Sequence, residues 1–311
     1  MSLRIIFLGT AGSLPTNDRS LPSIVIRREG EVLMFDCGEG TQRQMMRAGI
    51  GFNRKMTVFI THMHGDHVLG LPGMMQTMSL LGRDKPLKIY GPPGIKAFIE
   101  AVTSTVKFWL SFPIEVSEIE VDGTVYNGGG YEVRAVWADH SIPSLAYALI
   151  EKPRPGKFYP EKAIALGIPK GPLWSRLQRG MDIILPEGRV IKPSDVLGPP
   201  RPGRKIVYSG DTRPSEKIAE LASGADVLIH EATLGDDLIE RAEEEGHSTP
   251  SGAARVALKA NVKLLVLMHI SARYSEAERL LSGARRIFPN IIIARDLEEI
   301  EIPLLRDSEG S

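Results

Sequence analysis

This sequence contains only one cysteine, Cys37, among its 311 residues. A single cysteine cannot form an internal disulfide, so we expect a reducing compartment, the cytoplasm. No apolar run is long enough to cross a bilayer, and Met1 to Ile5 run directly into an expected strand without a signal-peptide pattern. We therefore expect a soluble protein without a membrane partner.

Net charge is also lacking, because 38 Lys and Arg balance 38 Asp and Glu. A neutral total argues against a polyanionic partner unless it hides local patches. One such patch lies between Lys152 and Met181, where seven bases face a single acid, Glu161, and nine of thirty residues are Gly or Pro. The segment carries a net charge of +6, which leaves −6 for the rest of the chain.

We interpret residues 152–181 as a flexible, basic, Gly/Pro-rich arm inserted into a single domain that spans residues 1–311. No regular strand or long helix is expected within it. Phe158, Tyr159 and Trp174 lie among its bases, a composition typical of surfaces that bind nucleic acid or a partner subunit. A solvated loop is the alternative interpretation.

Three of the seven histidines and one aspartate gather in the run Thr61-His62-Met63-His64-Gly65-Asp66-His67. An apolar, β-branched run precedes it and a helical pattern follows, so the junction directs His62 and His64 to one side and Asp66 and His67 to an adjacent side. Two neighbouring metal ions fit this arrangement better than one. Imidazole and carboxylate are ligands for Zn, Mn or Fe. A solvated turn with chance histidines is the alternative.

Other candidate ligands follow expected strands. His140, Asp211 and His269 each stand at the carboxyl end of a strand, where open α/β sheets place their sites. Strands alternate with helices in both halves of the chain, so an α/β fold with two halves facing each other through their sheets would bring these residues to one rim. Asp36, at the end of an earlier strand, is a candidate to hold the second ring nitrogen of a ligand histidine, or else to cap a helix.

The order of these ligands resembles the metallo-β-lactamase superfamily and, within it, the ribonuclease Z family. The resemblance implies an αββα sandwich, in which two mixed sheets face each other with helices outside, plus a protruding arm that holds tRNA. The closer match rests on four short motifs and on the Gly/Pro pattern from Gly167 to Pro172 in the arm. The motifs are Pro15-Thr16-Asn17-Asp18-Arg19-Ser20, His230-Glu231-Ala232-Thr233, Gly246-His247-Ser248-Thr249 and Ser271-Ala272-Arg273-Tyr274.

The resemblance also implies roles for individual residues. Two zinc ions per subunit are expected, with manganese or iron as alternatives. One ion is assigned to His62, His64 and His140, the other to Asp66, His67 and His269, with Asp211 between them. Asp66, His247 and Glu231 are the expected catalytic residues: Asp66 accepts a proton from water, and His247, oriented by Glu231, is the general acid. Helix capping by His247 and a core-edge position for Glu231 are the alternatives. Expected substrate contacts are Arg273, Arg19, Lys170, Arg176 and Arg179.

The function expected from the resemblance is endonucleolytic removal of the 3′ trailer from precursor tRNA by a homodimer. Cleavage just after the discriminator nucleotide would leave a 3′-OH on the tRNA and a 5′-phosphate on the trailer. One alternative is a small-molecule phosphodiesterase, arylsulfatase or lactonase with the same metals, for which the basic arm has no use. Another is a non-catalytic RNA-binding subunit.

Overall fold

The computed structural model describes residues 2–304, which fall into two compact units. Unit 1 contains residues 2–150 and 205–303, and unit 2 contains Glu151–Arg204 together with Leu304. Within the described part of the chain, no helix is both long and apolar enough to cross a membrane. The two units are described separately below.

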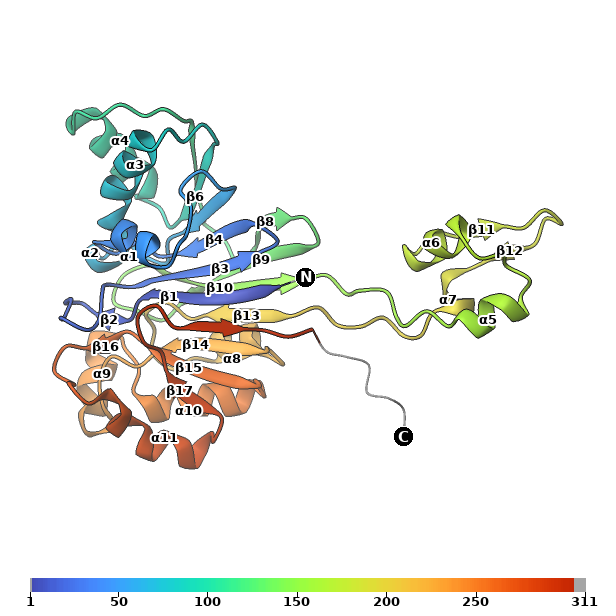
Figure 1. Cartoon of the computed structure of the whole chain (residues 1–311). Helices are drawn as coiled ribbons and strands as arrows, with labels where there is room; N and C mark the ends of the chain where they lie inside the picture. The colour runs from blue at the N-terminus through green and yellow to red at the C-terminus, as the bar shows by residue number, and fades with distance from the viewer. Residues whose placement is uncertain (1, 305–311) are drawn as a thin grey trace. The chain divides into compact units, whose positions relative to one another are not determined.

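Unit 1 is built on two seven-stranded mixed sheets that lie face to face (Figure 1). The order in the first sheet is β18 (Glu299–Glu301), β1 (Leu3–Gly9), β3 (Ser23–Arg28), β4 (Glu31–Phe35), β5 (Met56–Phe59), β6 (Leu87–Gly91) and β7 (Ile114–Glu118). The order in the second is β17 (Ile291–Ile293), β15 (Leu264–Met268), β14 (Val227–Glu231), β13 (Lys205–Tyr208), β10 (Ser144–Glu151), β9 (Tyr131–Ala138) and β8 (Gly123–Gly128). Each sheet is partly parallel and partly antiparallel.

Large aromatic side chains fill the space between the two sheets. Phe35 and Phe59 of the first sheet stack at a centroid distance of 5.1 Å, and Tyr147 of the second sheet lies 5.8 Å from Phe35. These side chains are almost fully buried. The central strands also bury their outer faces, which explains why their sequences are continuously apolar instead of alternating.

Helices cover the outer face of each sheet, so the fold is the predicted αββα sandwich (Figure 1). The first sheet is covered by α1 (Thr41–Arg47), α3 (Gly70–Leu80) and α4 (Ile95–Thr105), and the second by α8 (Glu216–Ala222), α10 (Pro250–Ala260) and α11 (Leu281–Ile287). The remaining elements of unit 1 are β2 (Ala11–Gly12), β16 (Ile270–Ser271), α2 (Gly65–Val68), η1 (Asp236–Leu238), α9 (Ile239–Glu245) and η2 (Ala277–Leu280).

Strand β10 explains where unit 2 is inserted in the chain. It pairs antiparallel with β13, with Ile150 opposite Lys205. The two strands are thus the arms of a hairpin, and residues 151–204 stand in place of its turn. Glu151 and Arg204, at the two ends of unit 2, form a buried two-point ion pair with N–O distances of 2.7 and 2.9 Å.

Unit 2 has short regular elements and a small core of its own. Between Lys152 and Met181, where neither a strand nor a long helix was expected, it has only two short helices, and its strands lie beyond Met181. It contains α5 (Pro160–Ala165), α6 (Pro172–Gln178), β11 (Ile183–Ile184), β12 (Val190–Ile191) and α7 (Pro193–Val196). Each helix begins with proline, which the first turn tolerates because its N–H groups have no partner in the helix. The core consists of Ala163, Ile168, Leu177, Ile183, Leu185, Ile191 and Val196.

Two of the three aromatic residues noted among the bases of unit 2 are partly buried inside it. Phe158 and Trp174 pack against this core, with their ring centroids 5.1 Å apart, and the indole N–H of Trp174 donates to the carbonyl of Ile168. They therefore stabilise the unit internally. The basic side chains of Lys170, Arg176 and Arg179 are exposed.

Candidate metal centre

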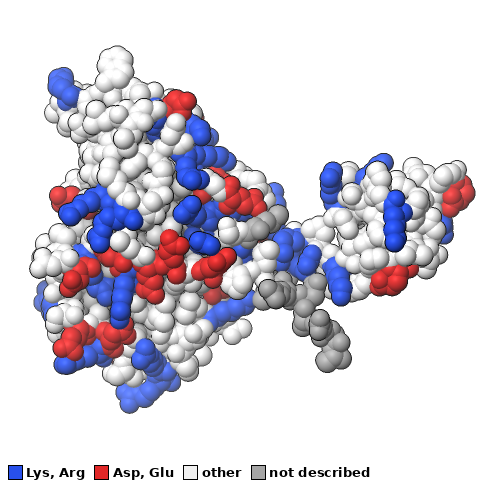
Figure 2. All heavy atoms as spheres, viewed as in Figure 1, with Lys and Arg blue, Asp and Glu red and all other residues white. Residues whose placement is uncertain are grey.

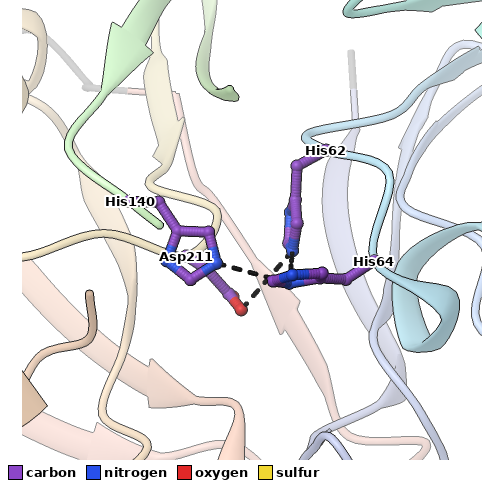
Figure 3. A group of neighbouring side chains, drawn as sticks. All are labelled: His62, His64, His140 and Asp211. Carbon is purple, nitrogen blue, oxygen red and sulfur yellow. Dashed lines mark hydrogen bonds and ion pairs between the residues drawn. The ribbon is translucent and has the colours of Figure 1, made fainter. Parts of the chain in front are cut away.

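Four of the predicted ligands converge at the rim where strands of both sheets end. His62 and His64 follow β5, His140 follows β9 and Asp211 follows β13, and Figure 3 shows their side chains pointing toward one another. Their ligand atoms all lie within 4.8 Å of each other. Nε2 of His62 is 3.0 Å from Nδ1 of His64, which is 3.4 Å from Nε2 of His140. Three ring nitrogens thus share one small space.

A second group lies directly beside the first. Nε2 of His67 is 3.2 Å from Nε2 of His269, which in turn is 3.4 Å from Oδ2 of Asp66. Oδ2 of Asp211 lies 3.5 Å from His67 Nε2, 3.3 Å from His269 Nε2 and 3.7 Å from His62 Nε2. A single carboxylate oxygen therefore adjoins both groups, as a bridging ligand must.

The chemistry of these side chains fits divalent cations. Burial lowers the pKa of His62 well below its usual value and also lowers the pKa values of His64 and His140, so these rings are neutral and have a lone pair to offer. Burial alone would raise the pKa of Asp211, but the nearby histidines hold it well below its usual value. Its Oδ1 atom is buried without a hydrogen-bond partner among the described residues. A buried carboxylate oxygen without a donor is what a cation would satisfy.

A network centred on Asp36 orients the outer nitrogens of two of these rings. Nδ1–H of His67 donates to Asp36 over 2.7 Å, while the Thr61 hydroxyl lies 3.0 Å from both carboxylate oxygens and 2.9 Å from Nδ1 of His62. The Tyr208 hydroxyl, from the opposite sheet, also donates to Asp36 over 2.8 Å. We call this set the Asp36 centre. Asp36 does not cap helix α1, whose N-cap residue is Gly40.

A second network is centred on Glu231, at the end of β14. Its Oε1 atom accepts from Nδ1–H of His247 over 2.9 Å, and its Oε2 atom accepts from the Thr233 hydroxyl over 2.7 Å. The Thr233 oxygen is in turn 2.7 Å from Nδ1 of His269. We call Glu231, Thr233, His247 and His269 the Glu231 centre. His247 is not the cap of α10, because Thr249 accepts the capping bond from Gly252 N–H.

The electrostatics of the Glu231 centre favour a charged histidine. Burial alone would lower the pKa of His247, but the adjacent Glu231 carboxylate raises it to about 9. The pKa of Glu231 is lowered, because the charge and hydrogen bond of His247 outweigh the effect of burial. An imidazolium beside an ionised carboxylate is able to donate a proton from its other ring nitrogen.

Backbone conformation at the rim is unusual where the ligands are held. Asp36 and His269 have φ values of 58° and 60°, a left-handed conformation that non-glycine residues rarely adopt. Strain of this kind concentrates at functional sites. The first loop packs closely against His269 at Gly12, because a Cβ atom there would lie 2.7 Å from Nδ1 of His269.

The two predicted phosphate contacts in unit 1 have different surroundings. Arg19 is partly buried, and its Nη1 atom donates to the Thr10 hydroxyl over 2.6 Å and to the carbonyl of Ala294 over 2.7 Å. One nitrogen of Arg19 is thus committed to holding the first loop. Arg273, four residues after His269, is exposed.

Three hydroxyl-bearing residues of the site were not predicted: Thr61, Tyr208 and Thr233. Thr61 and Thr233 stand one and two residues from the predicted site residues His62 and Glu231, and both belong to runs singled out in the sequence. The sequence pattern indicates only that Tyr208 belongs to a strand. Its hydrogen bond to Asp36 exists because the two sheets face each other.

Comparison with known proteins identifies the family. Residues 3–100 match a family model described as anti-Pycsar protein Apyc1, and residues 195–270 match a beta-lactamase superfamily domain. A ribonuclease Z of Methanosarcina acetivorans is 51% identical over 97% of this chain and 98% of the relative, and that of Haloferax volcanii is 46% identical over 100% and 98%. The crystal structure of the short form of human tRNase Z matches with a TM-score of 0.71 and 30% identity, over 96% of this chain and 99% of that one. The resemblance found in the sequence motifs is therefore confirmed: this chain belongs to the ribonuclease Z family.

Proposed function

We propose that this chain is a metal-dependent endoribonuclease that removes the 3′ trailer from precursor tRNA just after the discriminator nucleotide. The observation that carries this function is the juxtaposition of two ligand groups, which Asp211 adjoins, with the neighbouring His247–Glu231 pair. Full-length identity with the curated ribonucleases Z supports the choice of substrate. The products are a tRNA with a 3′-OH and a trailer with a 5′-phosphate.

The ligand set favours two zinc ions per subunit over manganese or iron, because five of its seven members are imidazoles. His62, His64 and His140 are proposed to hold one ion, Asp66, His67 and His269 the other, and Asp211 both. When bound, such a pair would lower the pKa of a water molecule and neutralise charge on the phosphate. The networks around Asp36 and Glu231 orient the rings before any ion arrives.

The proton transfers are assigned to residues of this chain. Asp66 accepts a proton from the attacking water, and its carboxylate is held in place by the backbone N–H of Ser13 over 2.9 Å. His247 donates a proton to the departing 3′-oxygen, so that a neutral hydroxyl leaves instead of an alkoxide. Glu231 fixes the ring through Nδ1 and leaves Nε2 to face the leaving group. The raised pKa of His247 supports this role, because the ring is protonated near neutral pH.

Unit 2 is proposed to be the tRNA-binding arm of an otherwise single catalytic domain. Its residues 151–204 contain eleven bases and five acids, a net charge of +6. Basic and acidic side chains are interspersed over unit 1 on the face drawn in Figure 2, whereas basic ones predominate on unit 2. Lys170, Arg176 and Arg179 are proposed to contact tRNA phosphates, with Arg273 and Arg19 as contacts near the site. Phosphate contacts of this kind give steep salt dependence without sequence preference.

We further propose that the chain acts as a homodimer in the cytoplasm. Unit 1 exposes large apolar side chains at the end of α3 and in the segment after α4, namely Leu80, Leu81, Val106 and Trp109. Ser111 N–H donates to Ser79 Oγ over 3.2 Å, which places these two stretches side by side. An exposed apolar patch of this kind is typical of a protein interface.

The first experiment incubates the purified chain with a 3′-extended precursor tRNA, with and without a chelator, and maps both new ends. We expect chelator-sensitive cleavage after the discriminator nucleotide that leaves a 3′-OH. Rapid hydrolysis of a small diester or lactone without tRNA cleavage would instead support a small-molecule hydrolase. Retention of metal without turnover of any substrate would support an RNA-binding subunit.

Removal of unit 2 tests the arm. Because β10 and β13 are antiparallel neighbours, Glu151 and Arg204 can be joined by a two-residue Asn-Gly turn that preserves the hairpin and their ion pair. We expect this variant to lose tRNA processing but to hydrolyse bis(p-nitrophenyl) phosphate at a rate close to the parent's. Loss of both activities would show that unit 2 stabilises the catalytic unit instead.

A milder variant changes only charge. Replacing Lys170, Arg176 and Arg179 by Gln should reduce the magnitude of the salt slope of tRNA binding by up to about 3, one for each lost phosphate contact. The matched control replaces three exposed bases of unit 1, Arg255, Lys259 and Arg286, and should leave the slope unchanged. Equal effects of the two triple variants would argue against a specific role for unit 2.

A further inference from the structure

Thr233 occupies a junction that the proposed mechanism does not use. Its side chain is 5% exposed, and it lies two residues beyond Glu231. Its hydroxyl oxygen is 2.7 Å from Oε2 of Glu231, 2.7 Å from Nδ1 of His269 and 3.2 Å from Nδ1 of His247. One hydroxyl therefore touches a proposed metal ligand and both members of the proposed acid pair.

The number of available protons fixes the direction of these bonds. A threonine hydroxyl has one proton to donate, and an ionised carboxylate can only accept. Thr233 must then donate to Glu231 and accept from His269, which requires the proton of His269 to be on Nδ1. The lone pair of His269 is consequently on Nε2, the atom that faces His67, Asp66 and Asp211.

We propose that Thr233 is a positioning residue that sets the tautomer of His269 and, through Glu231, the orientation of His247. The inference rests on the proposed function and deepens it. His269 Nδ1–H donates to the Thr233 hydroxyl, and that hydroxyl donates to the Glu231 carboxylate. The same carboxylate also accepts a hydrogen bond from His247 Nδ1–H. One hydrogen-bond network therefore holds both the proposed ligand His269 and the proposed acid His247.

The same arrangement occurs independently in the other half of unit 1. The Thr61 hydroxyl lies 3.0 Å from the Asp36 carboxylate and 2.9 Å from Nδ1 of His62, while Nδ1 of His67 meets the same carboxylate. In both centres a threonine connects one histidine to a carboxylate that directly holds a second histidine. The repetition on a different strand, with different neighbours, argues that the hydroxyl is part of how this chain orients its rings.

The test compares Thr233→Val, which keeps the shape but removes the hydroxyl, with Thr233→Ser, which keeps the hydroxyl. Thr57→Val is the matched control, because Thr57 is 1% exposed in strand β5 and has no role in the site. We expect Thr233→Val to release metal at a chelator concentration about 10- to 100-fold lower than the parent, the range seen when a partner of a ligand histidine is removed. Thr233→Ser and the control should retain metal like the parent.

A second readout addresses the link to His247. In a precursor tRNA with sulfur in place of the scissile 3′-oxygen, the leaving group is a thiolate, which needs no general acid. At saturating zinc, Thr233→Val should lose more activity on the oxygen substrate than on the sulfur substrate. Equal losses on the two substrates would overturn the link to His247.

A third measurement needs neither metal nor RNA. It uses the parent chain, so it can be made even if Thr233→Val does not fold. Long-range ¹H–¹⁵N NMR spectra of the metal-free parent, assigned with a His269→Gln variant, should place the His269 proton on Nδ1. A proton on Nε2, or parent-like metal retention in Thr233→Val, would overturn the proposal. Since these measurements involve no RNA, they decide the role of Thr233 even if the parent chain does not cleave precursor tRNA.

Discussion

The Asp36 and Glu231 centres are made from the same kinds of residue, and we propose that they prepare their histidines for different tasks. Each has a buried carboxylate that accepts from Nδ1–H of one histidine and from a threonine hydroxyl that contacts another histidine. In the Asp36 centre, both histidines direct Nε2 into the ligand groups. In the Glu231 centre only His269 does so, and we assign His247 to proton transfer.

Burial and the source of the supporting donors distinguish the two centres. The side chains of Asp36 and His67 are fully buried, whereas that of His247 is 12% exposed. Asp36 is secured by the Tyr208 hydroxyl from the opposite sheet, while Glu231 is secured by the backbone N–H groups of Thr212 and Thr233 over 3.0 Å each. We propose that the same carboxylate–histidine unit holds ligands at Asp36 and supplies an acid at Glu231, because only the His247 ring reaches solvent.

The largest effect is expected from Asp36→Ala. The substitution would leave buried donors on Thr61, His67 and Tyr208 without an acceptor, and breaking such a buried charged network costs about 3–5 kcal/mol. We expect urea denaturation to show a loss of that size in the free energy of unfolding, together with loss of bound metal. A variant that retains parent stability and metal would mean that the Asp36 centre does not mount the ligands.

His247→Ala is expected to affect rate without affecting metal. Loss of a general acid lowers the rate by about 10²- to 10⁴-fold, so single-turnover cleavage of precursor tRNA should fall by that range. Metal content measured by atomic absorption should stay at the parent value, because the two main ligand groups do not need His247. Loss of metal would instead make His247 a ligand with Asp211 and His269, the one grouping that includes it.

Tyr208→Phe should have the smallest effect. It removes one of several donors to Asp36 while keeping the ring in the core between the sheets. A single hydrogen bond contributes about 1 kcal/mol to net stability, so the midpoint of urea denaturation should fall slightly while cleavage stays within about threefold of the parent. A large loss of cleavage would show that the hydroxyl crossing between sheets also fixes the geometry of the ligands.

The convergence of four ligands could be predicted from the sequence because each follows a strand. His62, His140, Asp211 and His269 stand at strand ends, and two halves that face each other through their sheets bring those ends to one rim. The αββα layering followed from the family resemblance and is confirmed. The hairpin of β10 and β13 could not be predicted, since the sequence from Ser144 to Glu151 is followed by the unusual composition of unit 2 instead of a recognisable turn.

Unit 2 shows how much its composition revealed. The Gly and Pro content predicted a segment without strands or long helices, and between Lys152 and Met181 the structure has only two short helices, each of which begins with proline. Phe158 and Trp174 are partly buried and pack against a core of only seven buried side chains. A core this small is assembled from scattered positions with no long periodic run to reveal it.

The sequence by itself determined which residue types are available for chemistry and on which strands they end, because these depend on local patterns and on their order along the chain. Only the tertiary structure decided that Asp36 serves His67, that a tyrosine of one sheet bonds an aspartate of the other, and that Thr233 stands between His269 and Glu231. Those assignments depend on atoms brought within about 3 Å across large separations in sequence, where hydrogen bonds are decided by tenths of an ångström.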